Sequence, residues 1–375
     1  MIVYVYPADP YGCGFYRLAF PGRAAREQGH DVRVVMPADR EGIGGSVDTR
    51  TGRLLPASLT FPPDADVIVL QRVAMTTMGQ GIPEMRRRGV AVVVDMDDDL
   101  RRIDPNNPAF WGMHQDSGSP LHSAKNALQA CLDATLVTVS TPPLLKAYAP
   151  HGRGVVLENR VPARYLDVPH RDEATIGWGG SVHSHPTDLN VVGPAVARLV
   201  REGVPYWGAG PDYRQHRDDQ GLRRALGLAP GEGDVETTGD VGFDDWPAAV
   251  ATMGVGIAPL ADTAFNAAKS WLKPLEYMAL GVPWVASPRA EYEKLWRLTG
   301  VGRMAKWPGD WYREVGRLVR DRGLRRAQSL VGRAAVVEHG LTYEASAWRW
   351  MEAWAHALDL QRGRAGAASK RVTIA

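Results

Sequence analysis

Residues 256–287 read GIAPLADTAFNAAKSWLKPLEYMALGVPWVAS, and this pattern predicts a strand, a loop, a helix and a second strand. The first apolar run ends at Ala258, and a polar loop follows. A helix is predicted over Ser270–Leu280, because the glycine directly after it, Gly281, is a common C-cap. The second strand opens at Pro283. Two apolar strands joined by a helix are typical of an α/β protein with a parallel sheet.

The beginning of this helix has the composition of an anion site. Lys269, Ser270 and Lys273 lie there, where backbone N–H groups are free and the helix dipole favours negative charge. Glu276 follows Lys273 by three residues and shares its helix face. A lysine could bind a diphosphate while the carboxylate accepts hydrogen bonds from ribose hydroxyls. The alternative interpretation is an ordinary solvated charge pattern. Only seven of the 44 basic residues are lysines, and two of those seven lie here.

The same alternation of strands and helices extends through the chain. A stretch with two prolines and no apolar period, 161–172, divides it into two similar halves. We therefore expect two doubly wound domains, whose ligands would bind beyond the carboxyl ends of the strands. The predicted organisation is an N-terminal domain over 1–165, a C-terminal domain over 173–340, a helix over 341–362 and a flexible tail over 363–375. A small hairpin is predicted within the long loop 38–63, at 47–55.

Composition excludes several classes of protein. The chain has 375 residues, 45% of them hydrophobic and 23% charged, with a net charge of +2. These values exclude a disordered chain and give no global attraction to nucleic acid or membrane. Two distant cysteines, Cys13 and Cys131, do not form a disulfide framework. No apolar run is long enough to span a bilayer, and no secretion signal is evident. We expect a cytoplasmic protein.

Residues 273–287, KPLEYMALGVPWVAS, resemble the donor-binding segment of GT-B glycosyltransferases. The segment is most similar to the retaining group often called family 4, whose members read K-x-x-E-Y-M-A-x-G-x-P-V-V-A-S. Other segments that resemble this family follow in the family's order: Gly12–Arg17, Glu158–Asn159, Thr175–Ser181, Tyr206–Pro211 and Gly239–Val241. The resemblance implies two Rossmann-like domains facing across a cleft, with C-terminal helices packing across both.

The resemblance also implies a function. The C-terminal domain would bind a nucleotide-diphosphate sugar, and the N-terminal domain would hold an acceptor whose identity the sequence leaves open. Transfer would retain the anomeric configuration and need no metal or other cofactor. Lys273 would offset charge on the leaving diphosphate, and Glu276 would hold the ribose. The expected donor-binding residues are Gly179, Gly180, Ser181, Gly208, Gly210, Val241, Asn266, Lys269, Ser270, Lys273 and Glu276.

The chain departs from the family pattern at two places. Many members carry another glutamate eight positions before the one that matches Glu276, but Ala268 stands there in this chain, so Asn266 or Lys269 would fill that space. The basic pair that follows the first strand of the family's C-terminal domain is also absent. Ser181, His183 and His185 stand there instead, and one of the histidines could reach a phosphate oxygen.

Acidic residues follow a buried strand in the N-terminal half, at Asp95–Asp99. In a GT-B enzyme they would face the acceptor, and Asp97 would hydrogen-bond or activate one of its hydroxyls as a catalytic residue. Two alternatives are a metal site of the kind GT-A glycosyltransferases use, and a plain strand-end turn with an N-cap. The expected acceptor-side residues are Gly12, Gly14, Arg17, Asp95, Asp98 and His114.

Three other functions fit the sequence. A nucleotide-sugar epimerase and a non-catalytic binding protein could use the same scaffold. A glycosyltransferase acting on DNA bases, as some phages use, gains some support from clustered arginines at 86–88, 101–102 and 223–224.

Overall fold

The computed structural model describes residues 1–39, 42–114, 116, 118–119, 121–185, 187–210, 220–239 and 241–363. Its contacts divide the chain into two compact units. Unit 1 comprises 1–103, 111–159 and the C-terminal segment from 343, and unit 2 comprises 104–110 and 160–342. The predicted tail lies almost wholly outside the described residues. Each unit contains one six-stranded sheet.

All strand pairs in the sheet of unit 1 are parallel, in the order β2-β1-β3-β4-β5-β6. Every residue of β3 and β4 is buried, as expected for strands covered on both faces. The strands are β1 (Val3–Tyr6), β2 (Val32–Val34), β3 (Val67–Gln71), β4 (Ala91–Met96), β5 (Leu136–Val139) and β6 (Gly154–Val156).

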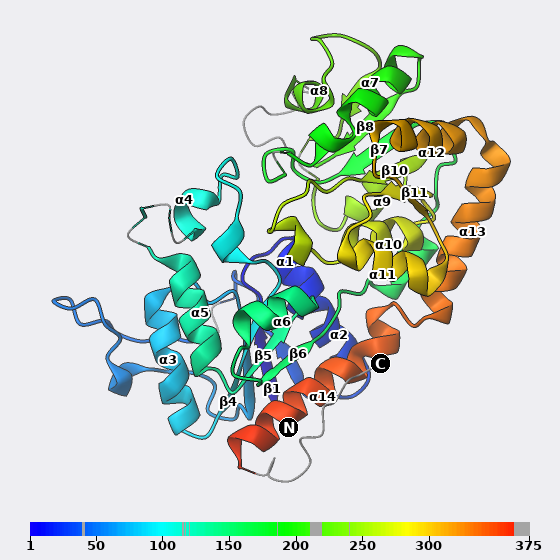
Figure 1. Cartoon of the computed structure of the whole chain (residues 1–375). Helices are drawn as coiled ribbons and strands as arrows, with labels where there is room; N and C mark the ends of the chain where they lie inside the picture. The colour runs from blue at the N-terminus through cyan, green and yellow to red at the C-terminus, as the bar shows by residue number, and fades with distance from the viewer. Residues whose placement is uncertain are drawn as a thin grey trace. The chain divides into compact units, whose positions relative to one another are not determined.

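Helices cover both faces of this sheet. The last helix, α14 (Tyr343–Gln361), packs against α2 (Phe20–Glu27) and against the central strands, and α3 (Thr76–Arg87) packs with α5 (Ser123–Asp133) (Figure 1). Trp350 and Trp354 of α14 are buried in this packing, whereas Trp348 is 48% exposed. The remaining elements are α1 (Gly12–Gly14), the π-helix η1 (Phe15–Ala19), η2 (Pro56–Ser58), η3 (Leu100–Arg102), α4 (Phe110–Met113) and α6 (Pro142–Tyr148).

Unit 2 repeats this architecture with the strand order β12-β11-β10-β7-β8-β9, again with parallel pairs throughout. The chain runs from β7 toward β9 on one side and then returns to β10 on the other side of β7. The strands are β7 (Ile176–Gly179), β8 (Tyr206–Ala209), β9 (Val235–Thr237), β10 (Val255–Ala258), β11 (Trp284–Ala286) and β12 (Arg303–Met304).

The helices of unit 2 enclose a large apolar core. On one face α7 (Gly193–Arg201) packs with α8 (Gln220–Leu226) and α12 (Pro308–Arg320), burying Trp178 and Trp311. On the other face lie α9 (Trp246–Val250) and α10 (Leu272–Ala279), and α13 (Arg322–Glu338) packs on α10. The other elements are η4 (Ala163–Asp167), η5 (Leu189–Val191), η6 (Asn266–Ala268) and α11 (Ala290–Thr299).

The structure confirms the predicted class, two doubly wound α/β sheets. The hairpin at 47–55 is present as a bridge between Val47 and Leu54. Two elements could not be read from the sequence pattern. Helix α3 begins at Thr76 and contains Pro83 in its interior, where a proline is unfavourable. The two-residue strand β12 is too short to show a pattern. No helix in the described part of the chain could span a membrane.

Candidate active site

The carboxyl ends of β7 and β10 mark the point in unit 2 where the chain reverses its direction across the sheet. Ligands of open α/β sheets bind at such a point, outside the carboxyl ends of the strands. The loops that follow β7, β8 and β10 meet at this edge, because the strands are parallel neighbours. These loops carry most of the residues that the sequence predicts to bind the donor.

Two glycines bring the ends of β7 and β8 together. Gly180 has φ +151° and Gly210 has φ +127°, in the region that favours glycine. The Gly180 N–H donates to the carbonyl of Ala209 at 2.7 Å. A Cβ at position 210 would overlap the backbone carbonyl of Gly180. The lack of a side chain at position 210 therefore lets the ends of β7 and β8 lie close together.

Lys273 reaches this corner from the first turn of α10. Its Nζ donates to the carbonyl oxygen of Gly179 and lies 4.9 Å from the centre of the buried Trp178 ring. Burial lowers the pKa of Lys273 to about 8, while the nearby Glu276 and Asp188 carboxylates oppose this shift. An ammonium in this setting gains from an incoming anion, because the anion restores the charge stabilisation that burial removes.

Glu276 lies one turn along the same helix and is 7% exposed. Its Oε1 accepts a hydrogen bond from the Trp246 indole at 2.9 Å. The ring of Trp246 covers Gly179, where a Cβ would lie 3.1 Å from it. Trp246, which the sequence did not single out, thus fixes the carboxylate beside the end of β7.

The neighbouring Tyr277 ties α10 to both central strands. Its hydroxyl accepts from the Gly179 N–H at 3.2 Å and donates to the Ile257 carbonyl at 3.1 Å. Helix α10 is thereby held in register with the two strands whose ends form the site.

Asn266 in the loop before α10 is committed to the interior of the loop. Its Nδ2 donates to Asp188 Oδ1 at 2.7 Å and to the Ala261 carbonyl at 3.1 Å. Asp188 also accepts from the Ala261 N–H at 2.8 Å, so it organises the loop. Asp188 was missed by sequence reasoning, because a single aspartate in a loop carries no recognisable signal.

The other predicted donor-binding residues lie around the same edge. Lys269 places Nζ 4.3 Å from the centre of the Phe265 ring, and Ser270 lies half-buried just before α10. Ser181 is half-buried in the loop after β7, and Val241 follows the Gly210–Gly239 bridge. Gly208 differs from these, because a Cβ there would meet Leu222 of α8 at 2.8 Å. Its lack of a side chain serves helix packing.

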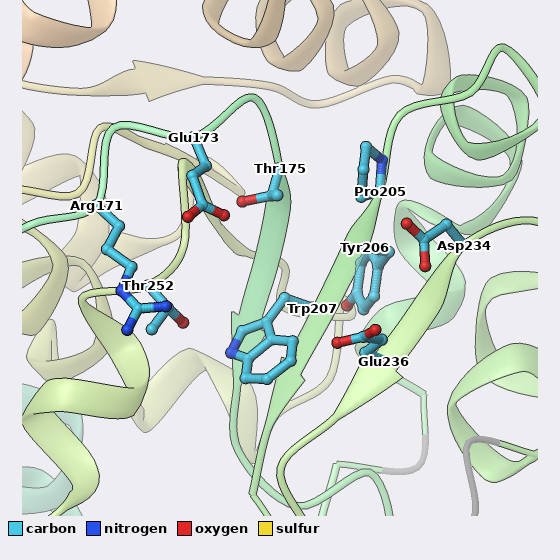
Figure 2. A pocket seen from close by; sticks show the side chains of 9 residues that line it. All are labelled: Arg171, Glu173, Thr175, Pro205, Tyr206, Trp207, Asp234, Glu236 and Thr252. Carbon is cyan, nitrogen blue, oxygen red and sulfur yellow. The ribbon is translucent and has the colours of Figure 1, made fainter.

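A separate cavity of about 370 Å³ opens at the opposite, amino end of β7 to β9 (Figure 2). Carboxylates and aromatic rings line it, and it contains none of the residues predicted to bind the donor. The lining residues are Arg171, Glu173, Thr175, Pro205, Tyr206, Trp207, Asp234, Glu236 and Thr252.

In unit 1 the structure places Arg17 and Asp95 inside the protein. Their guanidinium and carboxylate form two hydrogen bonds, of 2.9 and 2.8 Å, and each side chain is 1% exposed. Arg17 also donates to the Leu157 carbonyl and to Asn159 Oδ1. In this conformation neither side chain is accessible to an acceptor, so both stabilise unit 1 instead of lining a site.

Asp97 and Asp98 remain closer to the surface and share one arginine. Arg72, directly after β3, donates to both carboxylates of this pair and to Cys13 Sγ, the last at 3.1 Å. Its backbone has φ 48°, which is strained for a residue with a side chain. Sequence reasoning missed Arg72, although it follows a predicted strand at the reversal point between β1 and β3.

The other acceptor-side residues occupy ordinary structural positions. The N–H groups of Tyr11 and Gly14 donate to Asp9 Oδ1 at 2.9 and 3.0 Å, and a Cβ at position 14 would overlap the Asp9 carbonyl. Gly12 has open space around it. His114 follows α4, and its Nδ1 accepts from the Asp116 N–H at 3.0 Å. No three metal-ligating side chains converge anywhere in the described ranges.

The clustered arginines that favoured a nucleic-acid partner are engaged within the protein. Arg87 and Arg88 bind Glu84, and Arg101 and Arg102 pair with Asp99. Arg223 is 6% exposed and donates to the Glu232 carbonyl. These contacts leave the clusters with less free charge for phosphates than the sequence suggests.

Comparison with solved structures shows the fold. The chain is similar to sucrose-phosphate synthase from Thermosynechococcus elongatus, with TM-score 0.60, 13% identity and coverage of 94% of this chain and 98% of the other. It is also similar to a glycosyltransferase from Rickettsia africae, with TM-score 0.61, 11% identity and coverage of 95% and 98%. A third similar structure is Anabaena HepE in complex with UDP, with TM-score 0.59, 13% identity and coverage of 95% of this chain and 99% of the other. The fold is thus that of GT-B glycosyltransferases.

No family model matches the chain, and no curated protein matches it in sequence.

We predict that Gly210→Ala lowers both stability and affinity for a nucleotide, because the new methyl group overlaps the Gly180 carbonyl and forces the ends of β7 and β8 apart. Gly227→Ala is the matched control, since Gly227 also has positive φ but has open space around it. The control should lose only about 1–2 kcal/mol from backbone strain. Denaturant unfolding and nucleotide titration measure both effects, and equal losses in the two variants would contradict the close-approach argument.

We predict that Arg17→Ala destabilises unit 1 by about 3–5 kcal/mol, because Asp95 would be left as a buried, uncompensated charge. Arg26→Ala on the exposed side of α2 should change stability by less than about 0.5 kcal/mol. Urea unfolding curves of the two variants test this difference. A stable Arg17→Ala protein with a raised KM for its acceptor would instead support the original acceptor-side assignment.

Proposed function

We propose that the chain is a glycosyltransferase that moves a sugar from a nucleotide-diphosphate sugar to an acceptor, of the retaining family 4 type. The observation that carries this proposal is Lys273, whose ammonium is held in a partly desolvated setting at the glycine-rich end of β7, where it donates to the Gly179 carbonyl. This arrangement favours an anionic group that can approach both the ammonium and the backbone.

In the proposed reaction the bond between the anomeric carbon and the β-phosphate oxygen breaks, and its electron pair stays on the diphosphate. A new bond forms between the anomeric carbon and the acceptor oxygen, which passes its proton to the departing diphosphate oxygen. Lys273 offsets the negative charge that develops on the leaving oxygen. Backbone N–H groups around Ser270, at the beginning of α10, would add to this stabilisation.

Glu276 would accept hydrogen bonds from the ribose hydroxyls. Its indole partner Trp246 holds one carboxylate oxygen, which fixes the direction of the group. Because Glu276 and Lys273 share a face of α10, a nucleotide bound along that face would place its ribose and its diphosphate one helical turn apart.

We propose that the nucleotide of the donor is UDP and that its sugar is a hexose. HepE, which shares the fold, has been solved in complex with UDP and in complex with UDP and glucose. A nucleotide-sugar donor also agrees with the resemblance of residues 273–287 to the family's donor segment.

Acceptor recognition is assigned to unit 1, where Asp97 and Asp98 would hydrogen-bond acceptor hydroxyls while Arg72 holds them in place. We expect turnover without a metal ion, because this arginine already pairs with both carboxylates that a metal would need. We also expect a cytoplasmic location, in agreement with the two free cysteines.

A thermal-shift screen tests the donor assignment. UDP-, GDP-, ADP- and dTDP-sugars are added separately, each with and without Mn²⁺. At a ligand concentration about 100 times Kd, binding adds about 2.7 kcal/mol to the free energy of unfolding. We expect one nucleotide to raise Tm, equally with and without the metal. No shift with any nucleotide sugar would contradict the proposal, and a shift that requires Mn²⁺ would overturn its metal-independent part.

We predict that Lys273→Ala lowers kcat by about 10²–10³-fold, because one electrostatic contact to the leaving group is lost. Glu276→Gln should mainly raise the KM for the donor. Lys306→Ala is the control, since the Lys306 ammonium lies over the ring of the neighbouring Trp307, outside the candidate site, and the variant should keep full turnover. The readout is release of nucleotide in the presence of an acceptor, with the anomeric configuration of the product read by NMR. Unchanged turnover in the Lys273 and Glu276 variants would refute the site.

A further inference from the structure

A second titratable group stands beside Lys273 in unit 2. His185, in the loop after β7, donates from Nδ1 to Asp188 Oδ2 at 2.8 Å. The carboxylate can only accept, so this bond fixes the proton on Nδ1 and leaves Nε2 as the nitrogen that can take up a further proton. Nε2 has no hydrogen-bond partner among the described residues, and the side chain is 22% exposed.

His185 and Lys273 converge on one aromatic ring. The imidazole contacts the edge of Trp178 with ring centres 5.9 Å apart and an interplanar angle of 87°. The Lys273 ammonium lies over the same ring at 4.9 Å. Two basic groups from different elements therefore reach the same corner, at the end of β7.

The empty corner disfavours an additional positive charge on His185. Burial lowers the pKa of His185, and Lys273 and Lys269 lower it further, while Asp188 opposes them. Asp188 is itself held by Asn266 and by the Ala261 N–H, so its charge is already shared. The charged groups facing His185 are Asp104, Asp188, Lys269 and Lys273.

We propose that His185, oriented by Asp188, is a second ligand of the donor diphosphate and becomes protonated when the donor binds. This inference rests on the proposed function, and it concerns a position where the family's basic pair is missing from the sequence. A diphosphate near Nε2 supplies the negative charge that the imidazolium lacks in the empty site, so binding and protonation favour each other.

The direction of the pH effect follows from this coupling. In the free protein His185 is neutral at about pH 7, because its pKa lies below the usual value of about 6.5. In the complex the anion raises the pKa of His185, so the complex holds one more proton. Affinity for the donor therefore rises as pH falls through the pKa of the complex, and it levels off once the free protein is also protonated.

Lys273 contributes little to proton uptake near pH 7. With a pKa of about 8 it is already mostly charged there. Its own uptake should appear only at higher pH, which separates the two groups in one titration series.

Isothermal titration calorimetry tests the inference. UDP-glucose is the probe, because its diphosphate diester exchanges no proton near neutral pH. Titrations at about pH 7 in two buffers of different ionisation enthalpy give the number of protons taken up. We expect the wild-type protein to take up nearly one proton for each UDP-glucose bound. The His185→Gln variant should take up nearly none and should bind UDP-glucose about 10- to 100-fold more weakly. The His183→Gln variant should take up as many protons as the wild type. His183 lies two residues away in the same loop and serves as the matched control.

Each alternative result is decisive. Binding of UDP-glucose without proton uptake, or equal uptake in His185→Gln, would overturn the inference and leave the proposed function standing. No binding of UDP-, GDP-, ADP- or dTDP-glucose would remove the proposed function and the inference with it. If His185→Gln does not fold, NMR titration of His185 in the wild-type protein with and without UDP-glucose replaces it. An unchanged pKa of His185 would then refute the inference.

Discussion

The contact between the Lys273 ammonium and the end of β7 is the interaction on which the candidate site depends. It requires a helix that begins close to the sheet edge, and Tyr277 anchors that helix to β7 and β10. It also requires a strand end without side chains, which glycines at 179 and 180 provide. This arrangement places the Lys273 ammonium in a desolvated position, which is unfavourable for an unpaired charge. An anion bound beside the ammonium would offset this penalty, so the corner is suited to an anion.

The two units use the same architecture for different purposes. In unit 2 the reversal point of the sheet brings glycine backbone and a desolvated cation together. In unit 1 the equivalent region is filled by charge pairs, because Arg17 neutralises Asp95 in the interior and Arg72 holds Asp97 and Asp98 near the surface. The backbone of Arg72 is strained, so holding this arginine beside the two carboxylates lowers the stability of unit 1. Only the outer pair is placed where a second substrate could reach it.

Strand and helix periodicity predicted both sheets, because buried parallel strands such as β3 and β4 are apolar along their whole length. The Lys273–Glu276 pair was also predictable, since its helical spacing and the C-cap at Gly281 are local signals. The burial of Arg17 and Asp95 was not, because it depends on Leu157 and Asn159, about 140 residues along the chain from Arg17. The partnerships of Asp188 and Arg72 are equally non-local and have no sequence signature.

A crystal structure of the protein with bound UDP would test the account most directly. The account predicts diphosphate oxygens within hydrogen-bond distance of Lys273 Nζ, at the end of β7, with the ribose hydroxyls on Glu276. Nucleotide bound elsewhere, for example in the cavity lined by Glu173, Trp207 and Glu236 at the opposite edge of the sheet, would contradict it.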